Sequence, residues 1–355
     1  MIKLILLNLN NDTVNLHSLI MKIKNKIFKN KVILVTGGTG SFGSAFVRDV
    51  LANYQFKKLI IFSRDEYKQF TLKNELKNSS QFNKIRFFIG DVRDKNRLNF
   101  ALKDVNIVIH TAALKQVDTI EYNPFEAINT NVIGTQNLVE ASINNNIEKF
   151  IALSTDKAAS PINLYGASKL TADKLVINGN NYSGSRKIKF SVVRYGNVFG
   201  SRGSVVELFS NLIKNKKGSL PITDIRMTRF IITLDQAIEF VIESISRMEG
   251  GEIFIPKIPS INVIDLAKAF MPNLKYKVTG LRVGEKIHET MCPVELSNAT
   301  YEDKNSYIIL EGEYKYKNKR NFRKVPNNFD WNSGNNKNFL KIKEIEELLI
   351  NHGYY

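Results

Sequence analysis

Cysteine and long apolar runs are what this sequence most clearly lacks. Cys292 is the one cysteine among 355 residues, which excludes a disulfide framework and a metal site built from several thiolates. No apolar run approaches the roughly 18 to 20 residues that a membrane-spanning helix needs. The N-terminal LILL is too short for the apolar region of a signal peptide and has no cleavage pattern after it. We therefore expect a cytoplasmic protein with no membrane partner and no metal site.

Acidic residues are also scarce relative to basic ones. The chain has 34 Asp and Glu against 51 Lys and Arg, which gives a formal net charge of +17. Such an excess can indicate a nucleic-acid partner, but here the lysines are spread along the chain rather than gathered in a tail or stripe. The sequence therefore favours no nucleic-acid partner, and a diffuse positive field would attract a doubly charged substrate.

Short apolar segments alternate with helix-length segments from Lys31 onward. The apolar segments read KVILVTGG, KKLIIFSRD, IRFFIGDV, VNIVIHTAA, KFIALSTD and KFSVVRYGNV. Nearly continuous apolar strands are typical of a parallel sheet that is covered on both faces. The alternation of strands and helices predicts an α/β fold with a doubly wound parallel sheet. After about Gly200 the alternation stops, which predicts a smaller C-terminal lobe.

A glycine-rich turn follows the first of these strands and opens a helix. In TGGTGSFG, Gly37 permits a sharp turn, Gly40 lets the backbone approach a pyrophosphate, and Gly43 lets the helix pack closely. The free N–H groups at the start of the helix would bind the anion. Other residues expected to line the dinucleotide lie in this loop and after the third and fourth strands, namely Thr36, Ser41, Phe42, Asp91, Val92, Ala112 and Ala113.

The tip of the second strand bears on the choice of dinucleotide. An acidic residue there would bind the ribose 2′-hydroxyl of NAD, but the sequence has Ser63 and Arg64, with Lys68 one helical turn later. A hydroxyl and two cations suit a 2′-phosphate, so NADP is the predicted cofactor. In the alternative, Arg64 is a solvated loop residue and Asp65 binds the ribose of NAD.

These signals divide the chain into four parts. We expect a leader over residues 1–25, a candidate for disorder, and a Rossmann domain over residues 26–200 whose sheet can take in later segments. A nucleotide-sugar-binding lobe is expected mainly over residues 201–325, followed by a C-terminal loop and helix over residues 326–355. Met21 precedes KIKNKIFKNKVILVTGG and is a candidate start of the natural protein. An intact mass that includes residue 1 or 2 would remove that hypothesis.

The stretch STDKAASPINLYGASK carries groups for two kinds of chemistry. Tyr165 and Lys169 are four residues apart and lie on one face of a helix. Lys169 can hold the nicotinamide ribose, and its charge would lower the pKa of Tyr165, which could then take a proton from a substrate hydroxyl. Asp156 and Lys157 follow a strand of the sheet, where α/β proteins bind ligands. Simple hydride transfer does not need this acid and amine.

With these motifs the sequence resembles the extended short-chain dehydrogenase/reductase family. The motifs TGGTGSFG, SRDEYK, GDVRD, ALKQV, EYNPFEAINTN, STDKAASPINLYGASK, VVRYGNVFGSRGSV, PITDIRMTRF and LRVGEKIHE resemble one branch, the inverting UDP-N-acetylglucosamine 4,6-dehydratases of pseudaminic acid biosynthesis. The resemblance is dense from about Lys31 to Pro293. It implies a lyase that regenerates tightly bound NADP in each cycle, supplies polysaccharide synthesis or flagellin glycosylation, and forms homo-oligomers, with hexamers as one option.

The expected product is UDP-2-acetamido-2,6-dideoxy-β-L-arabino-hexos-4-ulose. In this chemistry C4 is oxidised, C5 loses a proton, the C6 hydroxyl leaves as water, and hydride returns to C6. By resemblance, Asp156 protonates the leaving hydroxyl, Lys157 takes the C5 proton, and Thr155 hydrogen-bonds the sugar O4. Lys157 and Tyr165 would stand on opposite faces of C5 and so invert it. The resemblance also implies substrate contacts from Lys115, Asn197, Arg229, Arg282 and Glu285, of which Lys115 could instead reach the nicotinamide.

The two elimination groups would need unusual protonation states. Burial must raise the pKa of Asp156 so that the carboxyl holds a proton. Desolvation or a neighbouring cation must lower the pKa of Lys157 so that the amine is neutral.

Other functions stay open on the sequence alone. A UDP-sugar 4-epimerase also uses Tyr-x-x-x-Lys, but it has no need of Asp156 and Lys157. A 4,6-dehydratase that retains the C5 configuration is the nearest alternative, although its membrane-bound relatives carry an N-terminal transmembrane domain. A non-catalytic NADP-binding scaffold would need neither Asp156 and Lys157 nor Tyr165 and Lys169.

Overall fold

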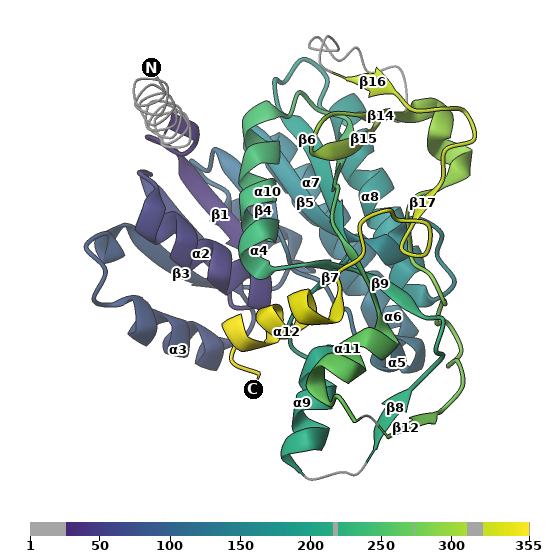
Figure 1. Cartoon of the computed structure of the whole chain (residues 1–355). Helices are drawn as coiled ribbons and strands as arrows, with labels where there is room; N and C mark the ends of the chain where they lie inside the picture. Colours follow the sequence, from purple (N-terminus) through teal and green to yellow (C-terminus); the bar gives the residue numbers. More distant parts are fainter. Residues whose placement is uncertain (1–25, 216–218, 274, 311–321, 355) are drawn as a thin grey trace, which may run out of the picture.

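A computed structural model describes residues 26–215, 219–273, 275–310 and 322–354 of the chain. The expected leader over residues 1–25 and the candidate start at Met21 lie outside the described residues. The described part is built around one large twisted sheet, with a smaller lobe at one end of its strands (Figure 1). No helix among the described residues is long and apolar enough to cross a membrane.

The large sheet confirms the predicted doubly wound α/β fold. Its parallel strands run in the order β3–β2–β1–β4–β5–β6–β10, and an antiparallel extension follows as β15–β14–β16. The order from β3 to β6 is that of dinucleotide-binding sheets. The strands are β1 (Val32–Thr36), β2 (Lys58–Ser63), β3 (Ile85–Ile89), β4 (Ile107–His110), β5 (Lys149–Thr155), β6 (Lys189–Tyr195), β10 (Glu252–Pro256), β14 (Thr300–Glu302), β15 (Ser306–Leu310) and β16 (Arg323–Lys324).

Helices cover the central strands because these strands are apolar on both faces. The residues of β1 and β10 are buried throughout, and so are all but the first of β2, β5 and β6. Helices α2 and α10 pack against each other, and α4, α7 and α8 form a second packed group (Figure 1). The helices are α2 (Ser41–Asn53), α3 (Glu66–Leu76), α4 (Lys95–Ala101), α5 (Val117–Tyr122), α6 (Pro124–Ala127), α7 (Gly134–Asn144), α8 (Leu164–Tyr182) and α10 (Leu234–Arg247), with a π-helical turn, η2 (Ile128–Ile133), before α7 and a 3₁₀ turn, η1 (Phe82–Lys84), before β3.

A second apolar cluster holds the smaller lobe together. Phe209, Leu266, Phe270, Ile345 and Leu349 are among its buried side chains, and the last two bring the C-terminal helix α12 onto α11. The lobe's elements are β7 (Asn197–Val198), α9 (Val205–Lys214), β8 (Leu220–Ile222), β9 (Thr228–Ile232), β11 (Ser260–Asn262), α11 (Val263–Phe270), β12 (Tyr276–Val278) and α12 (Ile342–Asn351). The segment 201–325 is thus shared between the two parts, because α10, β10, β14 and β15 belong to the large sheet and its cover.

A short strand pair connects the C-terminal region to the tip of β5. Strand β13 (Thr290–Cys292) pairs with β17 (Trp331–Asn332), and β13 also packs against the 3₁₀ turn η3 (Asp156–Ala158) that follows β5. A further 3₁₀ turn, η4 (Val294–Ala299), leads from β13 into β14. Since the carboxyl ends of the parallel strands meet at one edge of the sheet, this contact brings the residues before β13 to the edge where ligands bind in such folds.

Candidate functional site

The glycine-rich loop between β1 and α2 has the shape that a dinucleotide pyrophosphate requires. Gly37 has a φ of +63°, and a Cβ there would lie 2.9 Å from the backbone of Ala112, so the loops after β1 and β4 touch. Gly40 caps α2 without any side-chain hydrogen bond, which leaves the first N–H groups of the helix for an anion. The expected cofactor residues Thr36, Ser41, Phe42, Gly43 and Ala113 lie in or beside these two loops, and Asp91 and Val92 follow β3. These residues fit a bound dinucleotide.

At the tip of β2, Asp65 is already engaged by its own helix. Its carboxylate accepts a hydrogen bond of 2.9 Å from the backbone N–H of Lys68, and the Lys68 ammonium lies 2.9 Å away. The hydrogen bond from Lys68 lowers the pKa of Asp65. Arg64 is half-exposed, 3.5 Å from the carboxylate of Asp91, and Ser63 is buried against Gln69. Because Asp65 is engaged in this way, the tip of β2 offers mainly positive charge to a substituent on the cofactor ribose.

Asp156 is the most deeply buried acid at the tip of β5. The Thr155 hydroxyl donates a hydrogen bond of 2.9 Å to Oδ1 of Asp156, and the Thr155 oxygen accepts one of 3.3 Å from the backbone N–H of Lys157. Oδ2 of Asp156 is buried and has no hydrogen-bond partner among the described residues. Burial raises the pKa of Asp156, against the opposing effect of the Lys157 charge. A buried carboxyl with one open oxygen suits a protonated acid that donates to a substrate.

Lys157 departs from the expectation of a lowered pKa. Its Nζ lies 3.1 Å from Oδ1 of Asp156 and 3.2 Å from Oε1 of Glu289. Burial alone would lower the pKa of Lys157, but the two carboxylates outweigh burial and raise it. The prediction of a lowered pKa was therefore wrong, because it gave burial more weight than the Asp156 carboxylate and did not include Glu289. A neutral amine can still form here if the proton passes from Lys157 to Asp156 across their direct contact.

The tyrosine and the second lysine lie on α8, as the spacing predicted. Burial raises the pKa of Tyr165 to about 12, and the Lys157 charge and the Thr155 hydroxyl act against this rise. The cation that favours the phenolate is thus Lys157, which corrects the expectation that Lys169 has this effect and that the pKa is lowered. The ammonium of Lys169 donates a hydrogen bond of 2.7 Å to the carbonyl of Leu153, and burial lowers its pKa.

Close packing of α8 against η3 brings Tyr165 and Lys157 together. A Cβ on Gly166 would collide with the carbonyl oxygen of Lys157, so only glycine lets the helix approach this turn so closely. Asn163 caps the helix, since its side-chain oxygen accepts a hydrogen bond of 2.8 Å from the Gly166 N–H. The first turn of α8 is therefore fixed beside the strand tip.

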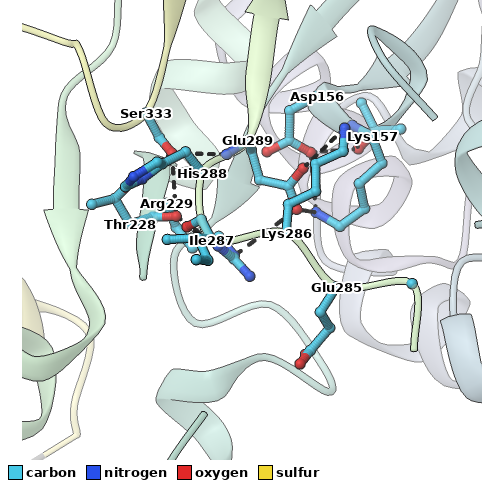
Figure 2. Close-up of polar contacts among 12 residues, drawn as sticks. Asp156, Lys157, Thr228, Arg229, Glu285, Lys286, Ile287, His288, Glu289 and Ser333 are labelled. Carbon is cyan, nitrogen blue, oxygen red and sulfur yellow. Dashed lines mark hydrogen bonds and ion pairs between the residues drawn. The ribbon is translucent and has the colours of Figure 1, made fainter. Parts of the chain in front are cut away.

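Glu289 is the site residue that the sequence did not single out. It immediately precedes β13, is 3% exposed, and points toward Asp156 and Lys157, whereas Glu285 points away from them (Figure 2). Nζ of Lys286 lies 3.9 Å from Oε2 of Glu289. The motif LRVGEKIHE contains both residues, but only the packing of β13 on η3 places them at the tip of β5.

The residues expected at the nucleotide end lie in two different surroundings. Arg282 is exposed and pairs with Glu285 at 2.5 Å, which lets the two act together at the surface. Arg229 is buried on β9, hydrogen-bonded to two backbone carbonyls and 4.0 Å from Oε1 of Glu289, so it belongs to the charged cluster. Asn197 begins β7, and Lys115 donates a hydrogen bond of 3.3 Å to the carbonyl of Arg202.

Comparisons with known proteins show the family to which the chain belongs. Residues 33–311 match the family described as "Polysaccharide biosynthesis protein". The chain is 49% identical to the "UDP-N-acetylglucosamine 4,6-dehydratase (inverting)" of Campylobacter jejuni subsp. jejuni serotype O:23/36 (strain 81-176), over 92% of this chain and 99% of that protein. It is 41% identical to a "UDP-glucose 4-epimerase" of Rickettsia bellii (strain OSU 85-389), over 92% and 98%. The X-ray structure of Pen from Bacillus thuringiensis superposes with a TM-score of 0.85 at 37% identity, over 92% of this chain and 99% of that one.

Proposed function

Because the chain belongs to the polysaccharide biosynthesis protein family, within the extended short-chain dehydrogenases/reductases, we propose that it is an inverting UDP-N-acetylglucosamine 4,6-dehydratase. As a hydro-lyase it removes water from the sugar and leaves a 4-keto-6-deoxy product with C5 inverted. The observation that carries this proposal is the contact between the fully buried Asp156 and the partly buried Lys157, whose polar atoms lie 3.1 Å apart beside Tyr165. Oδ2 of Asp156 has no hydrogen-bond partner among the described residues, which leaves it available to a substrate.

The same pair explains how the elimination groups return to their starting state. Lys157 takes the proton from C5, and Asp156 gives a proton to the C6 hydroxyl, which leaves as water. This step leaves an ammonium and a carboxylate in direct contact. Transfer of one proton from Lys157 to Asp156 restores the neutral amine and the protonated acid. The C5 proton thus serves the next elimination, and no proton need enter from solvent for the pair to reset.

Tyr165 accounts for the remaining proton. It accepts the proton of the C4 hydroxyl, and later returns it to C5 from the face opposite Lys157, so that the configuration inverts. When bound, a nicotinamide dinucleotide takes the hydride from C4 and returns it to C6 within one cycle. Lys169 holds its ribose, and Thr155 hydrogen-bonds the sugar O4. In this proposal the proton that leaves C5 and the proton that returns come from different groups.

A 4-epimerase is the second candidate, because relatives at 41% identity carry that name. Epimerisation would use Tyr165 and Lys169 alone, whereas a buried acid and amine are costly to desolvate without a function. The test is incubation of the purified protein with UDP-N-acetylglucosamine and no added cofactor, followed by mass spectrometry. A product lighter by one water supports the dehydratase, and a product of unchanged mass would favour the epimerase.

We propose NADP as the cofactor, bound through Arg64, Ser63 and Lys68. Replacing Arg64 by Ala should weaken NADP binding by roughly 10- to 100-fold and leave NAD binding unchanged, since a charge-assisted hydrogen bond contributes about 1.5 to 3 kcal/mol. Titration of the cofactor-depleted protein with each dinucleotide measures both affinities. Arg86→Ala is the matched control, because Arg86 lies near the start of the neighbouring strand β3, away from the tip of β2, and contacts backbone carbonyls. An unchanged preference in Arg64→Ala would contradict the assignment.

The remaining proposals concern the nucleotide and the setting of the enzyme. Arg282 and Glu285 hold the uridine end, Asn197 meets the diphosphate, and Lys115 reaches the sugar or the nicotinamide. The buried Arg229 reaches the diphosphate only if its guanidinium turns from Glu289. The product would enter pseudaminic acid synthesis and glycosylation of flagellin or a polysaccharide, in the cytoplasm, by a homo-oligomer. These points are supported by the resemblance of the chain to the Campylobacter jejuni dehydratase.

A further inference from the structure

We propose that Glu289 is a positioning residue for proton transfer at C5, which holds Lys157 beside Asp156 and stabilises it once it has taken the proton. The inference deepens the proposed dehydration and rests on it. Glu289 is far from the β5 tip in sequence, and no spacing links it to Asp156 and Lys157, although the motif LRVGEKIHE contains it. Its carboxylate touches the base directly, so its effect on the reaction would pass through Lys157.

Glu289 and Asp156 hold the amine of Lys157 between them. Oε1 of Glu289 lies 3.2 Å from Nζ, and Oδ1 of Asp156 lies 3.1 Å from the same atom (Figure 2). The same Oε1 lies 4.0 Å from Nε of Arg229 on β9, and Oε2 of Glu289 lies 3.9 Å from Nζ of Lys286. Neither Oε2 of Glu289 nor Nζ of Lys286 has a hydrogen-bond partner in the part of the chain that the structure describes.

The backbone that carries Glu289 is fixed on two sides. Its N–H donates a hydrogen bond of 2.9 Å to the Ser333 hydroxyl, and its carbonyl accepts one of 2.8 Å from the Ser333 N–H. Two residues earlier, the carbonyl of Ile287 accepts a hydrogen bond of 3.0 Å from the Thr228 N–H. A catalytic group must be held by rigid neighbours to stay in its productive geometry. Glu289 can therefore fix the position of the flexible Lys157 side chain.

The two carboxylates around Lys157 have opposite tendencies to hold a proton. Burial raises the pKa of Asp156, and the negative charge of Glu289 adds to this effect. Burial would also favour a protonated Glu289, but Lys157, Arg229 and Lys286 outweigh it and lower the pKa of Glu289. Paired groups whose pKa values are pushed apart usually have different catalytic roles. Asp156 is thus the acid that carries a proton, and Glu289 is the carboxylate that stays ionised.

A permanent negative charge beside Lys157 makes it a stronger base. The C5 proton is acidic only through the neighbouring ketone, so its removal creates an ammonium in a buried site. The Glu289 carboxylate stabilises that ammonium, as the third member of a catalytic triad stabilises and orients its base. Tyr165, which faces Lys157 from α8, is protonated at this stage and does not supply the charge.

The test is Glu289→Gln, which keeps the shape and removes the charge. With substrate deuterated at C5, loss of the label and of water should slow by roughly 10² to 10³-fold. Oxidation at C4, followed in a single turnover by nicotinamide absorbance, should stay within about threefold of wild type. Because a neighbouring negative charge raises the pKa of both Asp156 and Lys157, its removal lowers both. The two limbs of the pH–rate profile for C5 deprotonation should therefore both move to lower pH.

Glu252→Gln is the matched control. Glu252, the first residue of β10, is also a fully buried carboxylate, but it accepts hydrogen bonds from the Ser191 hydroxyl and from the backbone N–H groups of Glu249 and Gly250, away from the cluster. This control should leave the rates of C4 oxidation and C5 deprotonation, and both limbs of the pH–rate profile, unchanged. Equal slowing of C4 oxidation and C5 deprotonation in Glu289→Gln, or no slowing of either, would overturn the inference.

Glu289→Asp decides the case if the glutamine variant does not fold. This variant keeps the negative charge, but its side chain is one methylene shorter, so the carboxylate lies farther from Lys157. C5 deprotonation should therefore slow by roughly tenfold while C4 oxidation is unchanged. A wild-type rate at C5 in this variant would overturn the positioning role. A wild-type protein that releases no water at all would instead overturn the proposed dehydration, and the inference with it.

Discussion

Lys157→Ala should abolish the loss of water from UDP-N-acetylglucosamine and still permit oxidation at C4. Removal of the general base should slow C5 deprotonation by roughly 10² to 10⁴-fold, so that the 4-keto sugar and the reduced cofactor accumulate in a single turnover. The Lys157 charge also favours the phenolate of Tyr165. Its loss raises the pKa of the phenol, and the pH dependence of C4 oxidation should move to higher pH. Absorbance of the reduced nicotinamide and mass spectrometry of the sugar measure the two effects.

Lys257→Ala is the matched control for this variant. Lys257 has a similar exposed fraction, 28% against 22% for Lys157, and also pairs with a carboxylate, Glu302, at 2.9 Å. It lies just after β10 and bonds to the segment beside β14, in the antiparallel extension of the sheet. Its replacement should leave water loss unchanged. Turnover near wild type in Lys157→Ala would show that Lys157 is not the base.

Tyr165→Phe should stop the reaction one step earlier. Without the phenol, the C4 hydroxyl has no proton acceptor, and C4 oxidation should fall by roughly 10² to 10⁴-fold. The C5 proton becomes acidic only once the ketone exists, so water loss should fall by the same factor. Neither reduced cofactor nor 4-keto sugar should accumulate in a single turnover, which distinguishes this variant from Lys157→Ala.

Tyr182→Phe is the control for the loss of a phenol from α8. Tyr182 is the last residue of the same helix and is 58% exposed, so its hydroxyl is far from the tip of β5. It should turn over at the wild-type rate. Rapid appearance of reduced cofactor in Tyr165→Phe would assign the first proton transfer to another group.

The parts of the site that could be predicted are those with local sequence signals. The glycine loop, the tip of β5 and the spacing of Tyr165 and Lys169 each depend on residues within one strand–turn–helix unit. The parallel sheet could be predicted because its strands are buried on both faces and are therefore apolar throughout. The sequence did not predict that β10 joins the large sheet or that α10 covers it, since both follow the break in the alternation after Gly200.

The protonation of Lys157 shows why the rest could not be predicted. The pKa of Lys157 is raised by Asp156 and also by Glu289, which lies beside Lys157 because β13 pairs with β17 and packs on η3. No periodicity or spacing links these segments. From the sequence, Lys157 had one acidic neighbour and a buried setting, which favours the neutral amine. In the structure, the carboxylates of Asp156 and Glu289 together outweigh burial and raise the pKa of Lys157.

The buried and partly buried charges at the tip of β5 favour a catalytic interpretation of the cluster. Asp156, Lys157, Arg229, Lys286 and Glu289 lie in contact around one point, and Oδ2 of Asp156 and Oε2 of Glu289 lack hydrogen-bond partners among the described residues. Apolar residues of similar volume often stabilise a fold as well as or better than a buried ion pair does. Unpartnered buried oxygens add a desolvation penalty of about 1 to 3 kcal/mol each. Stability alone therefore does not account for this arrangement, whereas proton transfer to and from a sugar does.

NMR of the freshly formed product in D₂O tests the central claim most directly. UDP-N-acetylglucosamine incubated with the wild-type protein should give a 4-keto-6-deoxy sugar with the L-arabino configuration at C5. Deuterium should be present at C5, because the returning proton comes from an exchangeable hydroxyl by way of Tyr165. A 4-keto product that retains the D configuration, or the absence of any dehydrated sugar, would contradict the assignment of Asp156, Lys157 and Tyr165 to an inverting elimination.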